Sequence, residues 1–392
     1  MREGKAAVVI LTGATGFLGG HLMAALLQRG ERLVILGRAS AGVSLADRIG
    51  RLLRWFGLDD RGDQIETAES DLIQPRCGLS RPRYEALCAM GASIIHCAAD
   101  TRFSERNRRA ITAANVEGLK GILDLAADSH APFFHHVSTA YVAGRCSGIC
   151  PEQLVHSGEF NNVYEETKAR AEQEVAVRCG REGLAYTIIR PSIVYGDSRS
   201  GRSTCFNALY HPVRSLSCIR DIYLDDIRYR GGHKARACGI ALRDGGVVRL
   251  PLRVFLSRRG HVDLIPVDYF VSAVMTILQH AESGAIYHLT SDAPTTIDDL
   301  AAYSQAFLRV DGIEVVDGSS NGVPLTPPEA LFQRFVEPYL PYLADTRRFD
   351  RRQAIRATAG LTPPALTYEI FERCMSYAMG VDWGNGREAR SA

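Results

Sequence analysis

The feature that most constrains this 392-residue chain is an apolar run that leads into a glycine-rich turn near the N-terminus. The run covers residues 6–11 (AAVVIL), and Gly13, Gly16 and Gly19 follow it before or within a segment of helical periodicity over 17–28. This order predicts a buried strand, a tight turn and a helix of the kind that binds dinucleotides. The first glycine would permit the turn, the second would admit a pyrophosphate, and the third would let helix and strand pack closely. The phosphates would then meet free N–H groups at the helix N-terminus.

Further apolar runs alternate with segments of helical periodicity along the chain. Predicted strands lie at 33–36, 65–72, 93–99, 133–137 and 285–289, and predicted helices at 45–56, 111–127 and 269–278. This alternation predicts an α/β fold with a doubly wound parallel sheet, which is Rossmann-like and has helices on both faces. Ligands of such a sheet bind at the carboxyl ends of its strands.

One long segment interrupts this pattern. Residues 202–260 lose the alternation of strands and helices, and the chain beyond 296 has a helical pattern broken by a proline-rich stretch. We therefore expect a nucleotide-binding domain over 1–200 that is completed by about 261–292. Residues 201–260 and 293–392 would form a smaller, mainly helical lobe that binds the substrate.

The composition narrows the class of protein. The net charge is +2, from 46 basic and 44 acidic residues, and no long basic run is interleaved with aromatic residues, so we expect no nucleic-acid partner. The ten cysteines are scattered, and the spacing of Cys146 and Cys150 is too loose for a zinc site. The first apolar run is too short for a signal peptide. We predict reduced thiols, no metal, no transmembrane segment and a cytoplasmic protein.

Arg38 occupies the position that selects between the two nicotinamide cofactors in dinucleotide-binding folds. It follows the predicted strand 33–36, where an acidic residue would bind the ribose 2′-hydroxyl and an arginine suits the 2′-phosphate of NADP. The alternative interpretation is a solvent-exposed arginine that closes the strand, because no second basic residue follows directly. We expect NADP(H) as the cofactor.

A Tyr-x-x-x-Lys pair follows the predicted strand 133–137. That strand runs into Ser138 and Thr139, and Tyr164 lies 25 residues beyond Thr139, four residues before Lys168. Residues four apart share one face of a helix, so we expect the ammonium to lie near the phenol and to lower its pKa. A strand-end hydroxyl would bind a substrate oxygen beside this pair. Alone, such a pair usually marks a solvent-exposed helix face; together with the glycine turn, in this order, it indicates a reductase site.

The chain resembles the extended short-chain dehydrogenases/reductases. More narrowly, it is similar to the branch of carrier-protein thioester reductase domains and fatty acyl-CoA reductases of the male-sterility type. The resemblance rests on residues 12–22 (TGATGFLGGHL), 70–80 (SDLIQPRCGLS), 94–99 (IIHCAA), 114–126 (ANVEGLKGILDLA), 136–144 (HVSTAYVAG), 164–168 (YEETK), 190–201 (RPSIVYGDSRSG) and 263–274 (DLIPVDYFVSAV). The segment 35–40 (ILGRAS) departs from the commoner LVRA of the family, which shifts the context of the arginine.

The resemblance implies a role for each residue of the pair and its neighbours. Tyr164 would be the proton donor, Lys168 its partner and a ligand of the cofactor ribose, and Thr139 the hydroxyl that holds the carbonyl oxygen. Thr139 is favoured because it stands five residues before Gly144, as in the family motif, and Ser138 stays an alternative. The expected cofactor-binding residues are Thr12, Gly13, Thr15, Gly16, Phe17, Leu18, Gly19, Arg38, Asp71, Leu72, Ala98, Ala99, Asn115, Ser138, Tyr164, Lys168, Pro191 and Ile193.

The substrate is less constrained by the sequence. The chain has no adenylation region or carrier segment, so we expect a thioester to arrive on an acyl carrier protein or on coenzyme A. A basic set, expected beside the cleft, suits a phosphopantetheine phosphate, and the alternative is a solvent-exposed charged loop. The set consists of Arg214, Arg220, Arg228, Arg230, His233, Lys234 and Arg236.

Three functions fit these observations. The favoured one is an NADPH-dependent reductase that converts an acyl thioester into an aldehyde, with further reduction to the alcohol left open. The second is an NAD(P)-dependent reductase, epimerase or dehydratase of a free carbonyl compound or a nucleotide sugar, which would use the same pair. The third is a nucleotide sensor or scaffold without turnover, which the presence of Thr139, Tyr164 and Lys168 disfavours.

Overall fold

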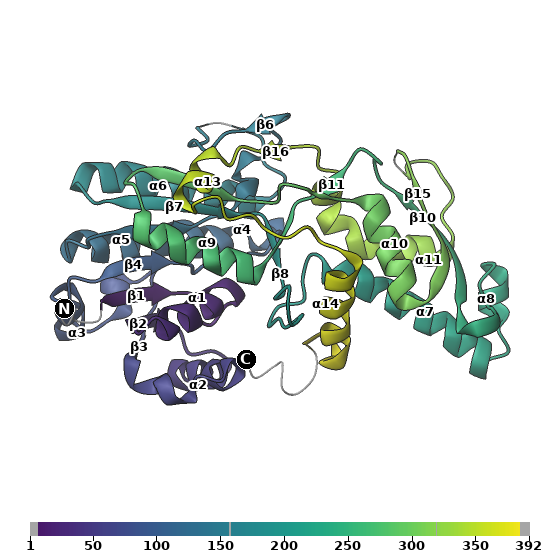
Figure 1. The fold of residues 1–392 in the computed structure, drawn as a ribbon, viewed down its shortest axis with the longest axis horizontal. Helices are drawn as coiled ribbons and strands as arrows, with labels where there is room; N and C mark the ends of the chain where they lie inside the picture. Colours follow the sequence, from purple (N-terminus) through teal and green to yellow (C-terminus); the bar gives the residue numbers. More distant parts are fainter. Residues whose placement is uncertain (1–6, 157, 319, 385–392) are drawn as a thin grey trace.

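The computed structural model describes residues 7–156, 158–318 and 320–384, and a parallel sheet of seven strands organises its first half. The strand order is β13-β7-β5-β4-β1-β2-β3, and every neighbouring pair is parallel (Figure 1). The order reverses between β1 and β4, the point at which such sheets bind ligands. The strands are β1 (Val8–Thr12), β2 (Arg32–Gly37), β3 (Ile65–Glu69), β4 (Ser93–His96), β5 (Phe134–Val137), β7 (Tyr186–Pro191) and β13 (Ala285–Leu289).

Helices cover both faces of this sheet, and each face has its own apolar core. One core joins the strands to α1 (Phe17–Gln28), α2 (Leu45–Phe56), α9 (Val267–His280) and α13 (Arg352–Ala357). The other joins them to α3 (Arg81–Cys88), α5 (Gly118–Asp128) and α6 (Val163–Glu182). The predicted α/β doubly wound fold is therefore confirmed.

Several predicted elements agree closely with the structure because their local signals are strong. Helix α2 begins after Ser44, whose side chain caps the N–H of Asp47, and it ends at Gly57, which is left-handed with φ 68°. Strand β3 ends at Glu69, three residues before the predicted end at 72. The single helix predicted over 111–127 is α4 (Arg108–Thr112), a π-helical turn over Ala113–Glu117, and α5.

The remaining part of the chain forms a lobe beside the sheet (Figure 1). Its main helices are α7 (Tyr210–Tyr229), α10 (Ile297–Leu308), α11 (Pro327–Val336) and α14 (Tyr368–Gly380). The lobe also contains a sheet in the order β15-β10-β9, with β9 at Ala241–Leu242, β10 at Val248–Phe255 and β15 at Val310–Val316. The lobe is therefore mixed rather than mainly helical, and its side chains form a third apolar core.

Short elements connect the two halves. The strand pairs are β6 (Ile149–Cys150) with β16 (Arg348–Phe349), β8 (Ile193–Tyr195) with β12 (Leu264–Pro266), and β11 (His261–Val262) with β14 (Thr295–Thr296). The short helices of the lobe are α8 (His233–Ala237) and α12 (Leu340–Leu343). In the part of the chain that the structure describes, no helix has both the length and the apolar character needed to cross a membrane.

Candidate active site

The glycine turn after β1 brings backbone close to backbone at two of its three glycines. Gly13 has φ 77°. A Cβ there would lie 2.5 Å from the backbone nitrogen of Ala98, which follows the neighbouring strand β4. A Cβ on Gly19 would overlap the carbonyl oxygen of Gly13. Gly16 precedes α1, whose first turn has neither a side-chain cap nor an acidic residue, so its N–H groups remain available to an anion.

A cleft of about 660 Å³ opens at this turn, and we call it the cofactor cleft. Eight of the predicted cofactor residues line it: Gly13, Thr15, Gly16, Arg38, Asp71, Leu72, Ala98 and Ala99. Phe17, Leu18 and Gly19 lie in the first turn of α1. Thr12 and Asn115 are buried and bonded within the protein, because the Thr12 hydroxyl contacts His96 Nδ1 at 2.8 Å and Asn115 Nδ2 donates to the Asp100 carbonyl at 3.0 Å. Ile193 lines a different cavity, in the lobe.

A second arginine, which the sequence analysis did not identify, joins Arg38 at the cleft. Arg48 of α2 lines the cleft and donates to the Arg38 carbonyl at 2.9 Å. Burial, and then the charge of Arg38, lower the pKa of Arg48. Among the described residues neither guanidinium pairs with a carboxylate. Two arginines that form no salt bridge therefore line the cleft beyond β2, and the charge of Arg38 helps to lower the pKa of Asp100 in the same cleft.

Thr139 and Tyr164 meet at the end of β5. Thr139 is buried, and its side chain lies close enough to the Tyr164 hydroxyl to lower the pKa of that phenol. The Thr139 hydroxyl also donates to the Pro191 carbonyl at 3.5 Å and accepts from the Tyr141 N–H at 3.3 Å. Ser138 is buried too, and its hydroxyl has no hydrogen-bond partner among the described residues. The two hydroxyls differ in that Thr139 contacts the phenol.

Lys168 follows Tyr164 by one turn of α6 and is 2% exposed. Its Nζ donates to the Val137 carbonyl at 2.7 Å and lies 3.5 Å from His136 Nε2. Burial lowers the pKa of Lys168 to about 8, against the opposing influence of Cys97 and Glu172. A charged amine held this close to the end of β5 can bind hydroxyl groups at the cleft.

The predicted lowering of the Tyr164 pKa is wrong. Burial raises the pKa of Tyr164 and outweighs the hydrogen bond from Thr139, which lowers it. The reason is that the Lys168 ammonium is bonded to the β5 carbonyl and His136, while the phenol is desolvated. Tyr164 therefore stays protonated at neutral pH, which is the form that a proton donor needs.

Two buried histidines lie behind Lys168. The His96 and His136 rings stack with centroids 5.5 Å apart, and burial lowers the pKa of both. Cys97 lines the cofactor cleft, and burial raises its pKa to about 11. These groups are neutral, so the Lys168 ammonium is a charge in a region of low polarity.

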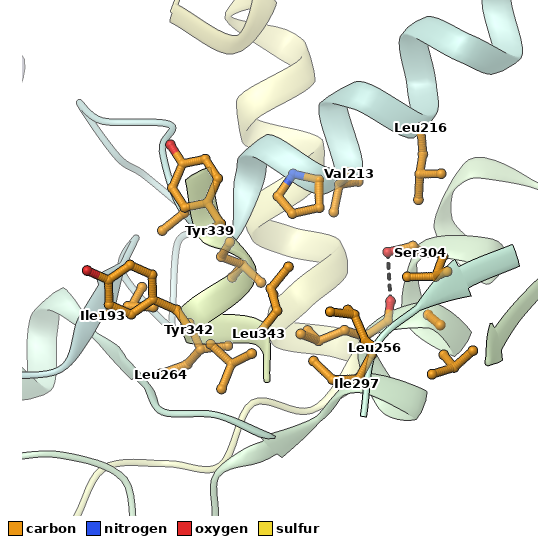
Figure 2. Close-up of a pocket in the computed structure, with 18 of the residues that line it drawn as sticks. Ile193, Val213, Leu216, Leu256, Leu264, Ile297, Ser304, Tyr339, Tyr342 and Leu343 are labelled. Atoms are coloured by element: carbon orange, nitrogen blue, oxygen red, sulfur yellow. Dashed lines mark hydrogen bonds between the residues drawn. The ribbon is translucent and has the colours of Figure 1, made fainter. Parts of the chain in front are cut away.

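A cluster of aromatic rings links Tyr164 to the lobe. Phe103 lies 6.1 Å from the Tyr164 ring, 6.0 Å from the Tyr339 ring and 5.5 Å from the Tyr342 ring, measured between centroids. Asn162 caps α6 two residues before Tyr164, and its Nδ2 donates to the Tyr342 hydroxyl at 2.6 Å. Both tyrosines line an apolar cavity of the lobe, which Figure 2 shows. Sequence reasoning missed these residues because nearly 240 positions separate Phe103 from its partners.

The basic set predicted beside the cleft lies elsewhere. Its residues belong mostly to α7 and α8, and Figure 1 shows α8 at the end of the lobe farthest from the seven-stranded sheet. Arg228 and Arg230 are exposed at the end of α7, whereas Arg220 pairs with Asp221 at 2.8 Å. The expectation that this set faces the cleft is therefore wrong for Arg228, Arg230 and the basic residues of α8, whereas Arg214 follows Val213 in the wall of the apolar cavity of the lobe. Helix α7 leads the chain away from the seven-stranded sheet. The loss of alternating strands and helices in the sequence did not predict this direction.

The cofactor cleft fits a phosphorylated dinucleotide. A glycine turn without side chains, a helix N-terminus without a cap and two arginines match its pyrophosphate and a further phosphate. Among the described residues, no group of three or more histidine, cysteine or acidic side chains could hold a metal ion.

Comparison with known proteins agrees with this geometry. The family model described as "Male sterility protein" matches residues 11–274. "Nonribosomal peptide synthetase asaC" of Aspergillus flavus is 27% identical over 317 residues, which are 76% of this chain and 27% of that protein. "Fatty acyl-CoA reductase 1" of Gallus gallus is 34% identical over 229 residues, 49% of this chain and 44% of that protein. The chain therefore spans less than half the length of these relatives.

The fold comparison extends over nearly the whole chain. The crystal structure of "the terminal R domain from the myxalamid PKS-NRPS biosynthetic pathway" has a TM-score of 0.74 and 25% sequence identity. The match covers 98% of this chain and 93% of that one. The resemblance found in the sequence motifs is thus accompanied by the same arrangement of sheet and lobe.

Proposed function

The chain belongs to the male sterility protein family, and on this basis we propose that it is an NADPH-dependent reductase of acyl thioesters. It has the fold of the extended short-chain dehydrogenases/reductases. The observation that carries the proposal is that the Thr139 side chain lies close enough to the Tyr164 hydroxyl to lower its pKa, with Lys168 one turn further along the same helix and bonded to the end of β5. The product is an aldehyde, and a second reduction to the alcohol is an extension that the same site can perform.

Arg38 and Arg48 support the choice of NADPH over NADH. Both arginines line the cleft, and the Arg48 guanidinium is bonded to the Arg38 backbone carbonyl after β2, so a 2′-phosphate there would gain two cationic partners. The ribose hydroxyl of NADH gains no comparable contact. We assign the pyrophosphate to the Gly13–Gly16 turn and the first N–H groups of α1.

Lys168 binds the cofactor ribose hydroxyls in this proposal and supplies a positive charge beside them. Its Nζ has two contacts inside the protein, to the Val137 carbonyl and to His136, so a further donor remains for a ligand. When bound, NADPH supplies the hydride that reduces the carbonyl carbon.

Tyr164 and Thr139 act on the oxygen of the thioester carbonyl. As hydride adds to the carbon, the oxygen becomes anionic, and the two hydroxyls donate to it. The Tyr164 phenol is protonated because burial raises its pKa, so it gives its proton to this oxygen. The hemithioacetal then collapses with loss of the thiol and leaves the aldehyde.

We propose that the thiol is the end of a phosphopantetheine arm, carried by an acyl carrier protein or by coenzyme A. The two relatives are named as a nonribosomal peptide synthetase and a fatty acyl-CoA reductase, which use thioesters of these two kinds of thiol. Both thiols share the same arm, so the chemistry at Thr139 and Tyr164 is the same.

The test is NADPH oxidation against a panel of acyl-coenzyme A thioesters, acyl-carrier thioesters, free aldehydes and nucleotide sugars. The proposal expects NADPH loss, free thiol and aldehyde in equal amounts with thioesters. Reduction of free carbonyl compounds alone would favour the simple carbonyl reductase. Turnover of nucleotide sugars alone would favour an epimerase or dehydratase, and cofactor binding without any turnover would favour a sensor.

A further inference from the structure

Thr139 and Tyr164 belong to different elements, so the distance between them depends on how those elements are held together. Thr139 follows β5 and caps the short helical turn Ala140–Ala143, whereas Tyr164 lies in the first turn of α6. Lys168, four residues after Tyr164, joins α6 to β5 through its bond to the Val137 carbonyl. A misplacement of about 1 Å between reacting groups can reduce turnover by about 10²-fold. A second link, on the other side of Tyr164, would therefore matter for catalysis.

Tyr342 of the lobe makes such a link at the start of α6. It is 4% exposed, and its hydroxyl accepts from Asn162 Nδ2 at 2.6 Å. The other end of this amide is used at the same time, because Asn162 Oδ1 accepts from the Glu165 N–H at 3.1 Å and caps α6. Burial, and then the nearby Glu165 carboxylate, raise the pKa of Tyr342, so this phenol keeps its proton. The Tyr342 hydroxyl thus lies against the two residues that flank Tyr164, Asn162 and Glu165.

The ring of Tyr342 contacts the other half of the site. It packs edge-on against the Tyr141 ring, with centroids 4.8 Å apart. Tyr141 is the residue whose backbone N–H donates to the Thr139 hydroxyl at 3.3 Å. The Arg347 guanidinium lies 5.3 Å from the Tyr141 ring centroid and donates to the Gly144 carbonyl. The turn that follows Thr139 is therefore held by side chains of the lobe.

A role in the wall of the apolar cavity does not account for the Tyr342 hydroxyl. An apolar wall needs only the ring, which phenylalanine would also supply. Figure 2 shows the hydroxyl pointing away from the apolar side chains of the cavity, such as Leu256 and Leu343. The ring also lies 5.5 Å from that of Phe103, which is 6.1 Å from the Tyr164 ring, measured between centroids. The polar contact of Tyr342 is thus made on the side of the reactive groups.

We propose that Tyr342 is a positioning residue that holds Tyr164 and Thr139 at the distance that their chemistry requires. With one side chain from the lobe, it joins the start of α6 to the turn after β5. This inference rests on the roles proposed for Tyr164 and Thr139, and it adds a residue that acts through its neighbours rather than on the reacting atoms. The lobe then contributes to the chemical step as well as to substrate binding.

The experiment measures hydride transfer in a single turnover, as the loss of NADPH absorbance with a saturating acyl-coenzyme A thioester. Tyr342→Phe removes the bond to Asn162 and keeps the ring contacts, so we expect the rate to fall by roughly two- to tenfold, the contribution of one neutral hydrogen bond. Tyr342→Ala also removes the contact with Tyr141, and the fall should approach roughly 10²-fold. In Tyr342→Phe, the Kd for NADPH and the KM for the thioester should change by less than about twofold, because only positioning is altered.

The matched control is Tyr303→Phe, in α10 of the same lobe. The half-buried Tyr303 donates from its hydroxyl to the Leu366 carbonyl at 3.5 Å, so this variant costs the lobe one hydrogen bond away from α6. Its rate of hydride transfer should equal that of the wild-type protein. Asn162→Ser keeps a capping hydroxyl but loses the donor to Tyr342. Adding Tyr342→Phe to it should slow hydride transfer no further, because both changes remove the same bond.

Amide hydrogen exchange tests the same link without a substrate. In Tyr342→Phe we expect faster exchange at residues 139–144 and 163–168, and in Tyr303→Phe no change in these segments. Slower hydride transfer with an unchanged Kd for NADPH, together with faster exchange there, supports the inference. Unchanged hydride transfer in both Tyr342 variants, unchanged exchange in the two segments, or an equal loss in Tyr303→Phe would overturn it.

Failure of the proposed function is a separate outcome. If the wild-type protein reduces a free aldehyde but no thioester, the thioester function fails, and the same rates measured with that aldehyde still test Tyr342. If Tyr164→Phe keeps near-normal turnover, the roles of Tyr164 and Thr139 fail, and the inference on Tyr342 falls with them.

Discussion

The cofactor cleft and the apolar cavity of the lobe are built from different kinds of group. The cleft uses backbone N–H groups, glycines without side chains and two arginines. The cavity uses side chains almost alone, and its polar atoms are bonded elsewhere. The first recognises a phosphorylated molecule of fixed shape, whereas the second excludes water and accepts apolar volume.

This difference suggests a division of labour between the two halves. Changes in the cleft should alter the affinity for the cofactor whatever the acyl group is, and changes in the cavity should alter the choice of acyl group whatever the cofactor is. Tyr164 and Thr139 should affect the chemical step whichever cofactor and acyl group are used. Each prediction below tests one side of this division.

The largest effect is expected at the proposed proton donor. Tyr164→Phe removes the hydroxyl that bonds to Thr139 and leaves the ring contact with Phe103, so the fold and NADPH binding should persist. We expect turnover to fall by roughly 10²–10⁴-fold, the usual contribution of a positioned proton donor. Tyr229→Phe, at a tyrosine that is 78% exposed, is the matched control. Near-normal turnover in Tyr164→Phe would remove this residue from the proposed catalytic site.

The next effect concerns the cleft alone. Arg48→Ala removes a cationic group that faces the proposed 2′-phosphate together with Arg38. A hydrogen bond to a charged group contributes about 1.5–3 kcal/mol, so the Kd for NADPH should rise by roughly 10–150-fold. The Kd for NADH should stay the same. Arg54→Ala, on the exposed side of the same helix, is the control.

Cofactor titration with purified protein measures both constants. Arg38→Asp should weaken NADPH binding in the same way and narrow the preference further. Equal affinity of the wild-type protein for both cofactors would contradict the assignment of these arginines. A change in the preferred acyl chain length in Arg48→Ala would break the division between cleft and cavity.

The third effect is a pH dependence that originates at Lys168. Burial lowers the pKa of this amine to about 8, so it is an ammonium below that pH and a neutral amine above it. We expect NADPH affinity and turnover to decline as the pH rises through about 8, approaching tenfold per pH unit where the charge is needed. The decline should be the same for short and long acyl groups. Lys168→Arg keeps its charge to higher pH, so its decline should move upward or disappear. If the decline in that variant stays at the same pH, the pH dependence originates at another group.

Sequence reasoning located the cofactor half well because its signals are local. Gly19 is required by its contact with Gly13 within one strand-turn-helix unit, and α2 carries its own cap and stop at Ser44 and Gly57. The pair Tyr164 and Lys168 also lies on one helix, as predicted.

The missed features depend on packing between distant segments. Arg48 meets Arg38 only because α2 folds back on the end of β2. Strand β10 contains Pro251 and shifts its register with β15 between Arg249 and Leu252, which weakens the strand pattern of its sequence. Its partner β15 also lies far along the chain. The raised pKa of Tyr164 follows from burial, which no spacing of residues reports.

The smallest effect is expected where the sequence analysis placed a phosphate site and the structure does not. Arg228 and Arg230 lie at the outer end of α7, and charged groups in water are screened beyond about 8 Å at physiological ionic strength. Reversing both charges to glutamate should therefore change KM for a coenzyme A thioester by less than about twofold, with kcat unchanged, because neither cavity is near them.

The same measurement at low and high salt separates a direct contact from a general field. A several-fold rise in KM that salt reproduces in the wild-type protein would mean that the thioester's phosphate binds along α7. The outer end of the lobe would then be a third part of the substrate site, and the contrast between one polar and one apolar cavity would be incomplete.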